Sequence, residues 1–342
     1  MSHYPKLHFG VIGIDHRHIY DHVASLLAIG AECAGYWTRG EPRTLPGFVE
    51  RFPDLRRVGD YHELLEDTSV HLIACAAIPC ERAGFGVEAM RHGKDFMADK
   101  PGVTSFEQLA EVQAAQRESG RIFSVDFTER FEVRAVTTAT ELVRSGAIGE
   151  VLQTVGLGPH RLNAPLRDNW FFDTRTYGGI LVDIASHQID QFLHFTGSAD
   201  ARIVVARVGN LAHPQFPGFQ DFGEIMLAQG KTSGYIRVDW FTPDGLPTWG
   251  DGRLTILGSD GYIELRKYVD IAGRPGKDHL FLVNHEGTRY IDCSAAPLPY
   301  YTDLQRDIFE RSETAMTHAH CLKVCELALK AQQAAETISG GV

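Results

Sequence analysis

The sequence predicts an α/β protein, in which a doubly wound parallel sheet precedes an α+β domain with a large, mostly antiparallel open sheet. Two patterns predict it. Over residues 7–127, short apolar runs alternate with helix-like segments, which is typical of a parallel sheet covered by helices. Beyond residue 200, strand-like runs follow one another without helices between them, which is typical of an antiparallel or mixed sheet. We place the domain boundary after residue 128, so the domains are residues 1–128 and 129–342.

The first domain's strands are predicted from short apolar runs at residues 7–14, 32–37, 70–77, 95–98 and 121–127. Helical segments fall between them, one ending near residue 29 and others at 81–92 and 105–119. In a sheet of this kind, ligands bind in the crevice at the carboxyl ends of the strands. Residues that follow those ends are therefore the first candidates for a binding site.

The second domain begins with a helix at 133–145 and a strand at 151–157, and ends with helices at 300–311 and 314–337. Its other strands are predicted at 202–208, 222–228, 233–241, 253–257, 262–265 and 279–283. In the strand 233–241, polar and apolar side chains alternate: Tyr235, Arg237 and Asp239 fall on one side, and Ile236, Val238 and Trp240 on the other. One face of this sheet should be covered by helices and the other open.

The composition describes an ordinary globular protein of 342 residues, with 44% hydrophobic and 23% charged residues. A formal net charge of −11 argues against a nucleic-acid partner, because no basic excess exists to neutralise phosphates. The six cysteines form no Cys-x-x-Cys motif, and we find neither an apolar signal segment nor an apolar run long enough for a membrane span. We expect a reduced, cytoplasmic protein with no membrane partner.

The first strand–helix turn carries part of a dinucleotide-binding pattern. Gly13 matches the first glycine of G-x-G-x-x-G, but Asp15 and His18 stand at the other two positions. Asp15 adds negative charge where a pyrophosphate should bind. His16, Arg17 and His18 can offset that charge and contact phosphate through their side chains.

The pair His16 and His18 also has the spacing of a His-x-His metal site. No third ligand is apparent nearby in the sequence, so we predict no metal.

The end of the second strand carries Trp37-Thr38-Arg39 where an acidic residue usually binds the adenosine ribose. An arginine there suits a 2′-phosphate, which makes NADP at least as good a candidate as NAD. The alternative is that Arg39 is a solvated loop charge.

Two further stretches carry candidate catalytic groups. Asp99-Lys100-Pro101 follows the fourth strand, so Lys100 is placed at the ligand-binding edge, unless it is an ordinary surface lysine before a turn. Downstream of Gly178-Gly179, a predicted helix places Asp183, His187 and Asp190 on one face. An imidazole beside a carboxylate suits proton transfer, although such pairs are also common on ordinary amphipathic helices.

With these stretches together, the chain resembles the glucose–fructose oxidoreductase/inositol dehydrogenase (Gfo/Idh/MocA) family over essentially its whole length. Asp99-Lys100-Pro101 stands where that family has Glu-Lys-Pro. The segment from Gly178 to Asp190 is similar to its Gly-Gly-x-x-x-Asp-x-x-x-His-x-x-Asp signature. Three more blocks resemble the family in order, namely residues 127–131, 145–151 and 257–265.

The resemblance implies a Rossmann-type first domain and a catalytic group of Lys100, Asp183 and His187. It also implies a cis peptide bond before Pro101, and a homodimer or homotetramer formed through the second domain's open sheet. The departures are two missing phosphate-loop glycines and the missing acidic ribose residue, and they leave the choice between NAD and NADP open.

The predicted function is an NAD(P)-dependent oxidoreductase acting on a secondary alcohol or ketone of a sugar, cyclitol or related polyol. Two alternatives stay open: a redox-neutral lyase or glycoside-cleaving enzyme that keeps its NAD bound, and a non-catalytic sugar or nucleotide sensor. Either His187 or Lys100 can be the base, and we expect their nitrogens within roughly 10 Å of each other. The predicted cofactor-binding residues are Gly10, Gly13, Asp15, His16, Arg17, His18, Thr38, Arg39, Ile78, Pro79 and Lys100. The predicted substrate-binding residues are Lys100, Arg130, His160, Trp170, Tyr177, Asp183 and His187.

Overall fold

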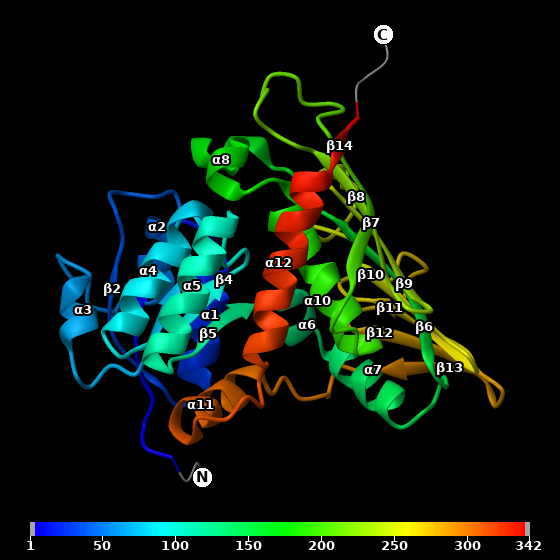
Figure 1. Ribbon diagram of the computed structural model, residues 1–342, viewed down its shortest axis with the longest axis horizontal. Coiled ribbons are helices and arrows are strands. Elements are labelled where there is room, and N and C mark those ends of the chain that lie inside the picture. The colour runs from blue at the N-terminus through cyan, green and yellow to red at the C-terminus, as the bar shows by residue number, and fades with distance from the viewer. Residues whose placement is uncertain (1–3, 339–342) are drawn as a thin grey trace. The chain divides into compact units, whose positions relative to one another are not determined.

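The computed structural model describes residues 4–338, which form two compact units (Figure 1). The first unit holds the chain up to Asp126 together with Pro165–Gly178 and Pro299–Cys325. The second holds Phe127–Ala164, Gly179–Leu298 and the chain from Glu326 onward. The units are interleaved along the chain, and the single domain boundary after residue 128 stays a prediction.

The first unit contains the predicted parallel sheet, which has five strands in the order β2-β1-β3-β4-β5. All its neighbouring strands run parallel. The strand order reverses between β1 and β3, so this fold places its ligand crevice at the carboxyl ends of those two strands. The strands are β1 (His8–Ile12), β2 (Glu32–Trp37), β3 (Leu72–Cys75), β4 (Asp95–Asp99) and β5 (Phe123–Asp126).

Helices connect these strands as the alternating pattern predicts. The three predicted ones are α1 (Ile19–Ala28), α4 (Pro79–Arg91) and α5 (Phe106–Ser119). The structure adds α2 (Leu45–Arg51) and α3 (His62–Glu66), which are too short for a helical period to be recognised in the sequence. From the far end of the chain, α11 (Tyr300–Glu310) joins this unit, and the Tyr301 hydroxyl donates a 2.6 Å hydrogen bond to Asp126 at the end of β5.

The second unit contains a nine-stranded mixed sheet with the order β13-β12-β11-β10-β6-β9-β8-β7-β14. Its pairs are antiparallel except β6 with β9 and β7 with β14. β13 and the two-residue β14 were not predicted, and β13 is so exposed that it lacks the apolar alternation that identifies a strand. The strands are β6 (Val151–Pro159), β7 (Arg202–Gly209), β8 (Phe222–Gln229), β9 (Thr232–Asp239), β10 (Arg253–Gly258), β11 (Gly261–Arg266), β12 (His279–Asn284), β13 (Gly287–Asp292) and β14 (Glu336–Thr337).

One face of this sheet carries the apolar core, and most of the opposite side chains are half-buried or exposed. α7 (Arg134–Arg144) packs on β11 and β12, and α10 (Ala185–Thr196) packs on β6 and β9. Ile236 and Val238 of β9 are buried while Arg237 between them is half-buried, which confirms the predicted alternation there. Asp239, predicted on the same side as Arg237, is buried as well. On β8, β10 and β11, the side chains of Met226, Leu257 and Tyr262 are each at least 40% exposed.

Two helix predictions were wrong in detail. The segment after Gly179 is not one helix but two, α9 (Ile180–Asp183) and α10. At the break, the Ser186 hydroxyl donates a hydrogen bond to the Asp183 carbonyl, and the His187 N–H donates to the Ile184 carbonyl.

The last helix begins at His318 rather than at residue 314. It is α12 (His318–Ala334), and the N–H groups of Thr314 and Ala315 donate instead to the Asp307 carboxylate. The remaining short helices are α6 (Thr128–Phe131), α8 (Thr174–Tyr177) and the 3₁₀ turns η1 (Ala164–Leu166) and η2 (Asn169–Phe172). Among residues 4–338, no helix combines the length and the apolar character that a membrane crossing requires.

Candidate active site

The turn after β1 is closed by Gly13, which is held against the end of β3. Gly13 has φ +78°, and a Cβ atom there would lie 2.3 Å from the Cβ of Ala77. Its N–H donates to the Trp37 carbonyl and its carbonyl accepts from the Ala76 N–H. No other residue fits this turn, because a side chain would collide with the Ala77 backbone. The predicted first glycine of the pattern is therefore confirmed as a tight-turn residue.

Gly10 lies within β1, and a Cβ atom there would approach Ile73 to 3.1 Å. This close packing between neighbouring strands explains the residue, and its predicted contact with a cofactor stays a prediction.

Asp15 in the same turn is an unusual carboxyl group. Burial, followed by the nearby charge of Glu81, raises its pKa to about 6. A carboxyl group with that pKa is partly protonated in mildly acidic solution, so the negative charge it presents to a pyrophosphate depends on pH.

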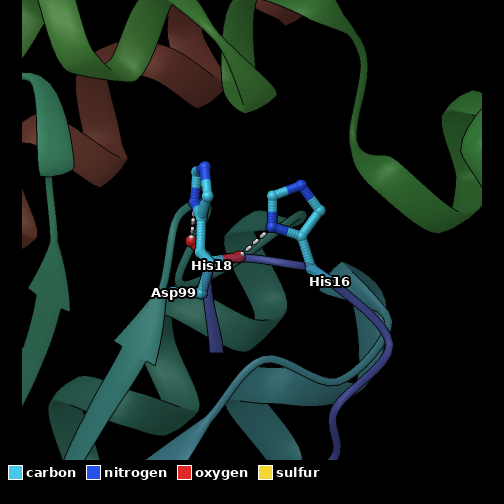
Figure 2. Close-up of side chains that lie close together, drawn as sticks. All are labelled: His16, His18 and Asp99. Carbon is cyan, nitrogen blue, oxygen red and sulfur yellow. Dashed lines mark hydrogen bonds and ion pairs between the residues drawn. The ribbon is translucent and has the colours of Figure 1, made fainter. Parts of the chain in front are cut away.

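His16 and His18 both contact the carboxylate of Asp99, as Figure 2 shows. The Nδ1 atom of His16 lies 2.8 Å from Oδ2, and the Nδ1 atom of His18 lies 2.8 Å from Oδ1. The two rings meet edge to face with their centroids 4.3 Å apart. The turn after β1 and the end of β4 are thus joined by one carboxylate.

The Asp99 carboxylate is completely buried and is also paired with Arg82 of α4, whose Nη2 lies 3.0 Å from Oδ2. Burial by itself would raise the pKa of Asp99, but the Arg82 charge, with contributions from His18 and from the hydrogen bond of His16, holds it well below its usual range. The pKa of His16 is lowered to about 3, first by burial, so this imidazole is neutral at physiological pH. Arg82 also donates to the carbonyls of Ala77 and Asp99, which anchors it independently of the carboxylate.

Lys100 follows Asp99 at the end of β4 and is 3% exposed. The peptide bond between Lys100 and Pro101 is cis, as the resemblance implies.

The remaining residues predicted to bind a cofactor lie at the ends of β2 and β3. Arg39 is two-thirds exposed and forms an ion pair with Glu81 of α4, so its guanidinium already has a carboxylate partner. Thr38 is buried. Ile78 caps α4 and Pro79 is its first residue, which places both at the amino end of that helix. Arg17 is exposed.

In the second unit, Asp183 ends α9 and His187 lies in the first turn of α10. Their side chains are 6% and 1% exposed. The His187 ring meets the Phe127 ring edge to face at a centroid distance of 6.4 Å. Burial of an acid and an imidazole this complete shows that the two residues do not form a surface pair, and their catalytic role stays a prediction.

A second buried carboxylate, Glu129 of α6, acts on His187 electrostatically. Glu129 accepts from Lys267 Nζ at 2.5 Å and from Gln188 Nε2 at 2.9 Å, and both Glu129 and Lys267 are at most 1% exposed. Burial by itself would raise the pKa of Glu129, but the charge and hydrogen bond of Lys267 act together with the two nearby histidines and lower the pKa to about 2. His187 and His160 also favour the ionised form.

The predicted substrate residues have defined surroundings within their own units. Arg130 forms two 2.7 Å hydrogen bonds to the buried carboxylate of Asp190. The His160 ring packs between Trp240 and Trp249, at centroid distances of 5.2 and 4.5 Å. In the first unit, Trp170 lies in η2, and the buried Tyr177 ring stacks on Phe171 at 6.2 Å. Their substrate contacts stay predictions.

The structure thus joins the first turn to the end of β4, and it buries both Asp183 and His187 within the second unit. Lys100 and His187 belong to different units, so their convergence on one cleft stays a prediction. Sequence reasoning missed Asp99 as a site residue, together with Arg82, Glu129 and Lys267. For Asp99 a signal existed, because it ends a predicted parallel strand at the same sheet edge as the first turn. For the others none existed, because their partners are distant in the chain.

Comparison with known proteins agrees with this geometry. Residues 7–127 match the model of an oxidoreductase family with an NAD-binding Rossmann fold, and residues 136–264 match that of the GFO/IDH/MocA C-terminal domain. A solved structure from Erwinia carotovora atroseptica SCRI1043 is 45% identical with a TM-score of 0.94, covering 98% of this chain and 100% of that one.

Two curated relatives from Bacillus subtilis (strain 168) are scyllo-inositol 2-dehydrogenases. The NADP(+) enzyme IolW is 26% identical over 66% of this chain and 62% of its own length. The NAD(+) enzyme is 21% identical over 72% of this chain and 71% of its own. Another curated relative is matched over only 50% of its length. The matches confirm the family resemblance, the fold class and the cofactor class, NAD or NADP, that the sequence predicts.

Proposed function

Because this chain belongs to the GFO/IDH/MocA oxidoreductase family, we propose that it transfers a hydride between NADP or NAD and a secondary alcohol or ketone of a sugar, cyclitol or related polyol. The observation that carries the proposal is the burial of all three predicted catalytic side chains, Lys100, Asp183 and His187, each at most 6% exposed. Buried ionisable groups are rare unless they are paired or functional. The names of the inositol dehydrogenase relatives support the substrate class.

The first turn fits a dinucleotide despite its missing glycines. Gly13 brings the end of β1 directly against the end of β3, where the strand order reverses and this fold binds its ligand. The raised pKa of Asp15 reduces the negative charge beside the phosphates in mildly acidic solution. When bound, the nicotinamide supplies the hydride acceptor or donor.

The chain's own residues handle the proton. In the oxidising direction, His187 or Lys100 accepts the hydroxyl proton of the substrate, and the Lys100 ammonium stabilises the negative charge that develops on that oxygen. Asp183 orients His187 or binds a neighbouring hydroxyl. The buried carboxylate of Glu129 favours the imidazolium form of His187, because an ionised group and a cation attract each other strongly away from water.

A further part of the proposal concerns cofactor choice. Arg39 lies just past β2 and pairs with Glu81, so a 2′-phosphate would have to displace Glu81 or share the guanidinium with it. A charge-assisted contact contributes roughly 1.5–3 kcal/mol, so NADP should bind about ten- to a hundredfold more tightly than NAD. Arg39→Ala should remove most of that preference. Equal binding of the two cofactors by the wild type would eliminate this role.

Turnover of a sugar and polyol panel with NAD and NADP tests the proposal. Lys100→Met and His187→Asn should each lower kcat by about a hundredfold or more. His285→Asn, which changes an exposed histidine of the second unit, should leave kcat unchanged. Stoichiometric release of NADH or NADPH would exclude the redox-neutral alternative. A folded protein that binds neither cofactor, with none retained from purification, would refute the oxidoreductase proposal.

A cytoplasmic location and a homo-oligomer complete the proposal. Support for the location comes from the six cysteines, which are all free thiols.

A further inference from the structure

The His16, His18 and Asp99 side chains form a compact group of possible metal ligands in the first unit. One donor atom from each residue lies within 4.8 Å of the other two. Figure 2 shows both imidazole rings directing Nδ1 toward the carboxylate, with a different oxygen facing each ring. Two of the three side chains come from one turn, and the third comes from the end of β4, 81 residues further along.

This donor set is the one that proteins use for borderline divalent cations. Two imidazole nitrogens and one carboxylate oxygen bind Zn²⁺, Fe²⁺, Co²⁺ or Mn²⁺ with positions left for other ligands, whereas Mg²⁺ and Ca²⁺ prefer oxygen donors alone. Ligands of one tetrahedral zinc ion lie about 3–3.5 Å apart, as bond lengths of about 2.0–2.2 Å require. The present separations therefore need only small side-chain rotations to enclose an ion.

The surroundings of Asp99 resemble the support that metal-binding carboxylates usually have. Arg82 contacts Oδ2 and is itself anchored to backbone carbonyls, so it orients the carboxylate while Oδ1 faces His18. Asp99 is completely buried, whereas the side chains of His16 and His18 are 14% and 33% exposed. The partial exposure of the histidines gives an ion a path into the group.

We propose that His16, His18 and Asp99 form a binding site for a divalent transition-metal cation of the Zn²⁺ or Co²⁺ class. The three side chains supply three coordination positions, and a fourth is open to water or to an oxygen atom of a small ligand. Because Arg82 already neutralises the charge of Asp99, the bound cation leaves the site positive. An anionic oxygen is therefore the ligand that suits the open position. The site stands independently of the oxidoreductase proposal, since its binding needs neither cofactor nor substrate.

Titration of the full-length, chelator-treated protein with Co²⁺ tests the site. One equivalent of Co²⁺ should bind, with visible d–d absorption between roughly 500 and 650 nm, the range expected for a four-coordinate site. His16→Ala and His18→Ala should each weaken Co²⁺ binding by about tenfold or more, because each removes one of three ligands. Zn²⁺ should displace the Co²⁺ signal.

His62→Ala is the matched control. His62 is a partly exposed histidine of the same unit that contacts two carboxylates, Asp60 and Glu88, but lies outside the proposed site. This variant should bind Co²⁺ like the wild type. Circular dichroism melting of every variant separates a lost ligand from a lost fold. No binding by the wild type, or equal loss in the His62 and His16 variants, would overturn the proposal and leave Asp99 as a carboxylate that only orients two imidazole rings.

Discussion

At the scale of single residues, the first turn keeps the tight geometry of a dinucleotide-binding fold although it lacks two of the three glycines of the pattern. Of the three glycine positions in the pattern, only the first holds a glycine, Gly13, and a Cβ atom there would lie 2.3 Å from the Cβ of Ala77. The second glycine position holds Asp15, which is partly buried and carries a raised pKa. The negative charge at the expected phosphate position is therefore reduced in mildly acidic solution.

Asp15→Asn should stabilise the protein at neutral pH and above. The pKa of Asp15 is higher in the folded state, about 6, than its ordinary value of 3.8, so folding favours the protonated form. That contribution is fully present below about pH 4 and is lost as the pH rises through 6. The asparagine variant should gain about 1–3 kcal/mol in free energy of unfolding at pH 8, and almost nothing at pH 4. Chemical denaturation at both pH values measures the difference.

The exposed Asp54 of the same unit provides the control for this prediction. Asp54→Asn should change the free energy of unfolding little at either pH. A gain from Asp15→Asn that is the same at both pH values would show that ionisation of Asp15 is not its source.

At the scale of the elements, three short segments of the second unit are held together by one buried ion pair. Glu129 belongs to α6, its partner Lys267 follows β11, and Gln188 on α10 donates to the same carboxylate oxygen. His187 is the neighbour of Gln188 on α10. A substitution of Glu129 or Lys267 should therefore change both the stability of the second unit and the electrostatic environment of His187, the proposed base.

Glu129→Gln should destabilise the protein by about 3–5 kcal/mol, because it leaves the Lys267 charge buried without a carboxylate. The double variant Glu129→Gln/Lys267→Met should recover much of that loss. Because the folded pKa of Glu129 is about 2, its stabilising effect is present above pH 4.5 and lost as the pH falls toward 2. The wild type should therefore lose stability relative to the double variant between about pH 5 and pH 2.

Urea unfolding of the wild type, the single variants Glu129→Gln and Lys267→Met, and the double variant measures the coupling between Glu129 and Lys267. Equal losses in the single and double variants would show that packing, rather than the ion pair, stabilises this region.

At the scale of the whole molecule, the side of the nine-stranded sheet opposite the apolar core carries several exposed apolar side chains. Met226, Leu257 and Tyr262 are exposed there on neighbouring or nearby strands, and Leu257 and Tyr262 are directly paired across β10 and β11. Exposed apolar side chains gathered on one sheet face mark interaction surfaces.

We expect a homodimer or homotetramer formed through this sheet face. Light scattering at micromolar concentration should give at least twice the 37.9 kDa mass of the chain. A double variant, Leu257→Glu/Tyr262→Glu, should shift the protein toward the monomer while leaving its far-ultraviolet circular dichroism unchanged, because both side chains already face solvent. A wild-type monomer under these conditions would contradict the expectation.

The local patterns of the sequence were sufficient for most of the fold. Alternating apolar runs predicted all five strands of the first sheet, and the alternation in β9 separated the buried Ile236 and Val238 from the half-buried Tyr235 and Arg237, although not from Asp239, which is buried. The motifs around Lys100 and His187 placed the chain in its family. These predictions succeeded because periodicity and turn chemistry act between residues that are close in the chain.

Contacts between distant segments were decided only by the tertiary structure. The helix after Gly179 is interrupted at Ile184, where the Ser186 hydroxyl donates to the Asp183 carbonyl and the His187 N–H donates to the Ile184 carbonyl. The apolar periodicity of the sequence does not predict these hydrogen bonds. Asp99 contacts His16 and also His18, which lies 81 residues away in the sequence. Lys267 neutralises Glu129 across 138 residues. Such pairs depend on which strand ends and helices the folded chain brings together. The sequence therefore determined the fold class and the candidate catalytic residues, whereas the folded chain decided which charges are buried together.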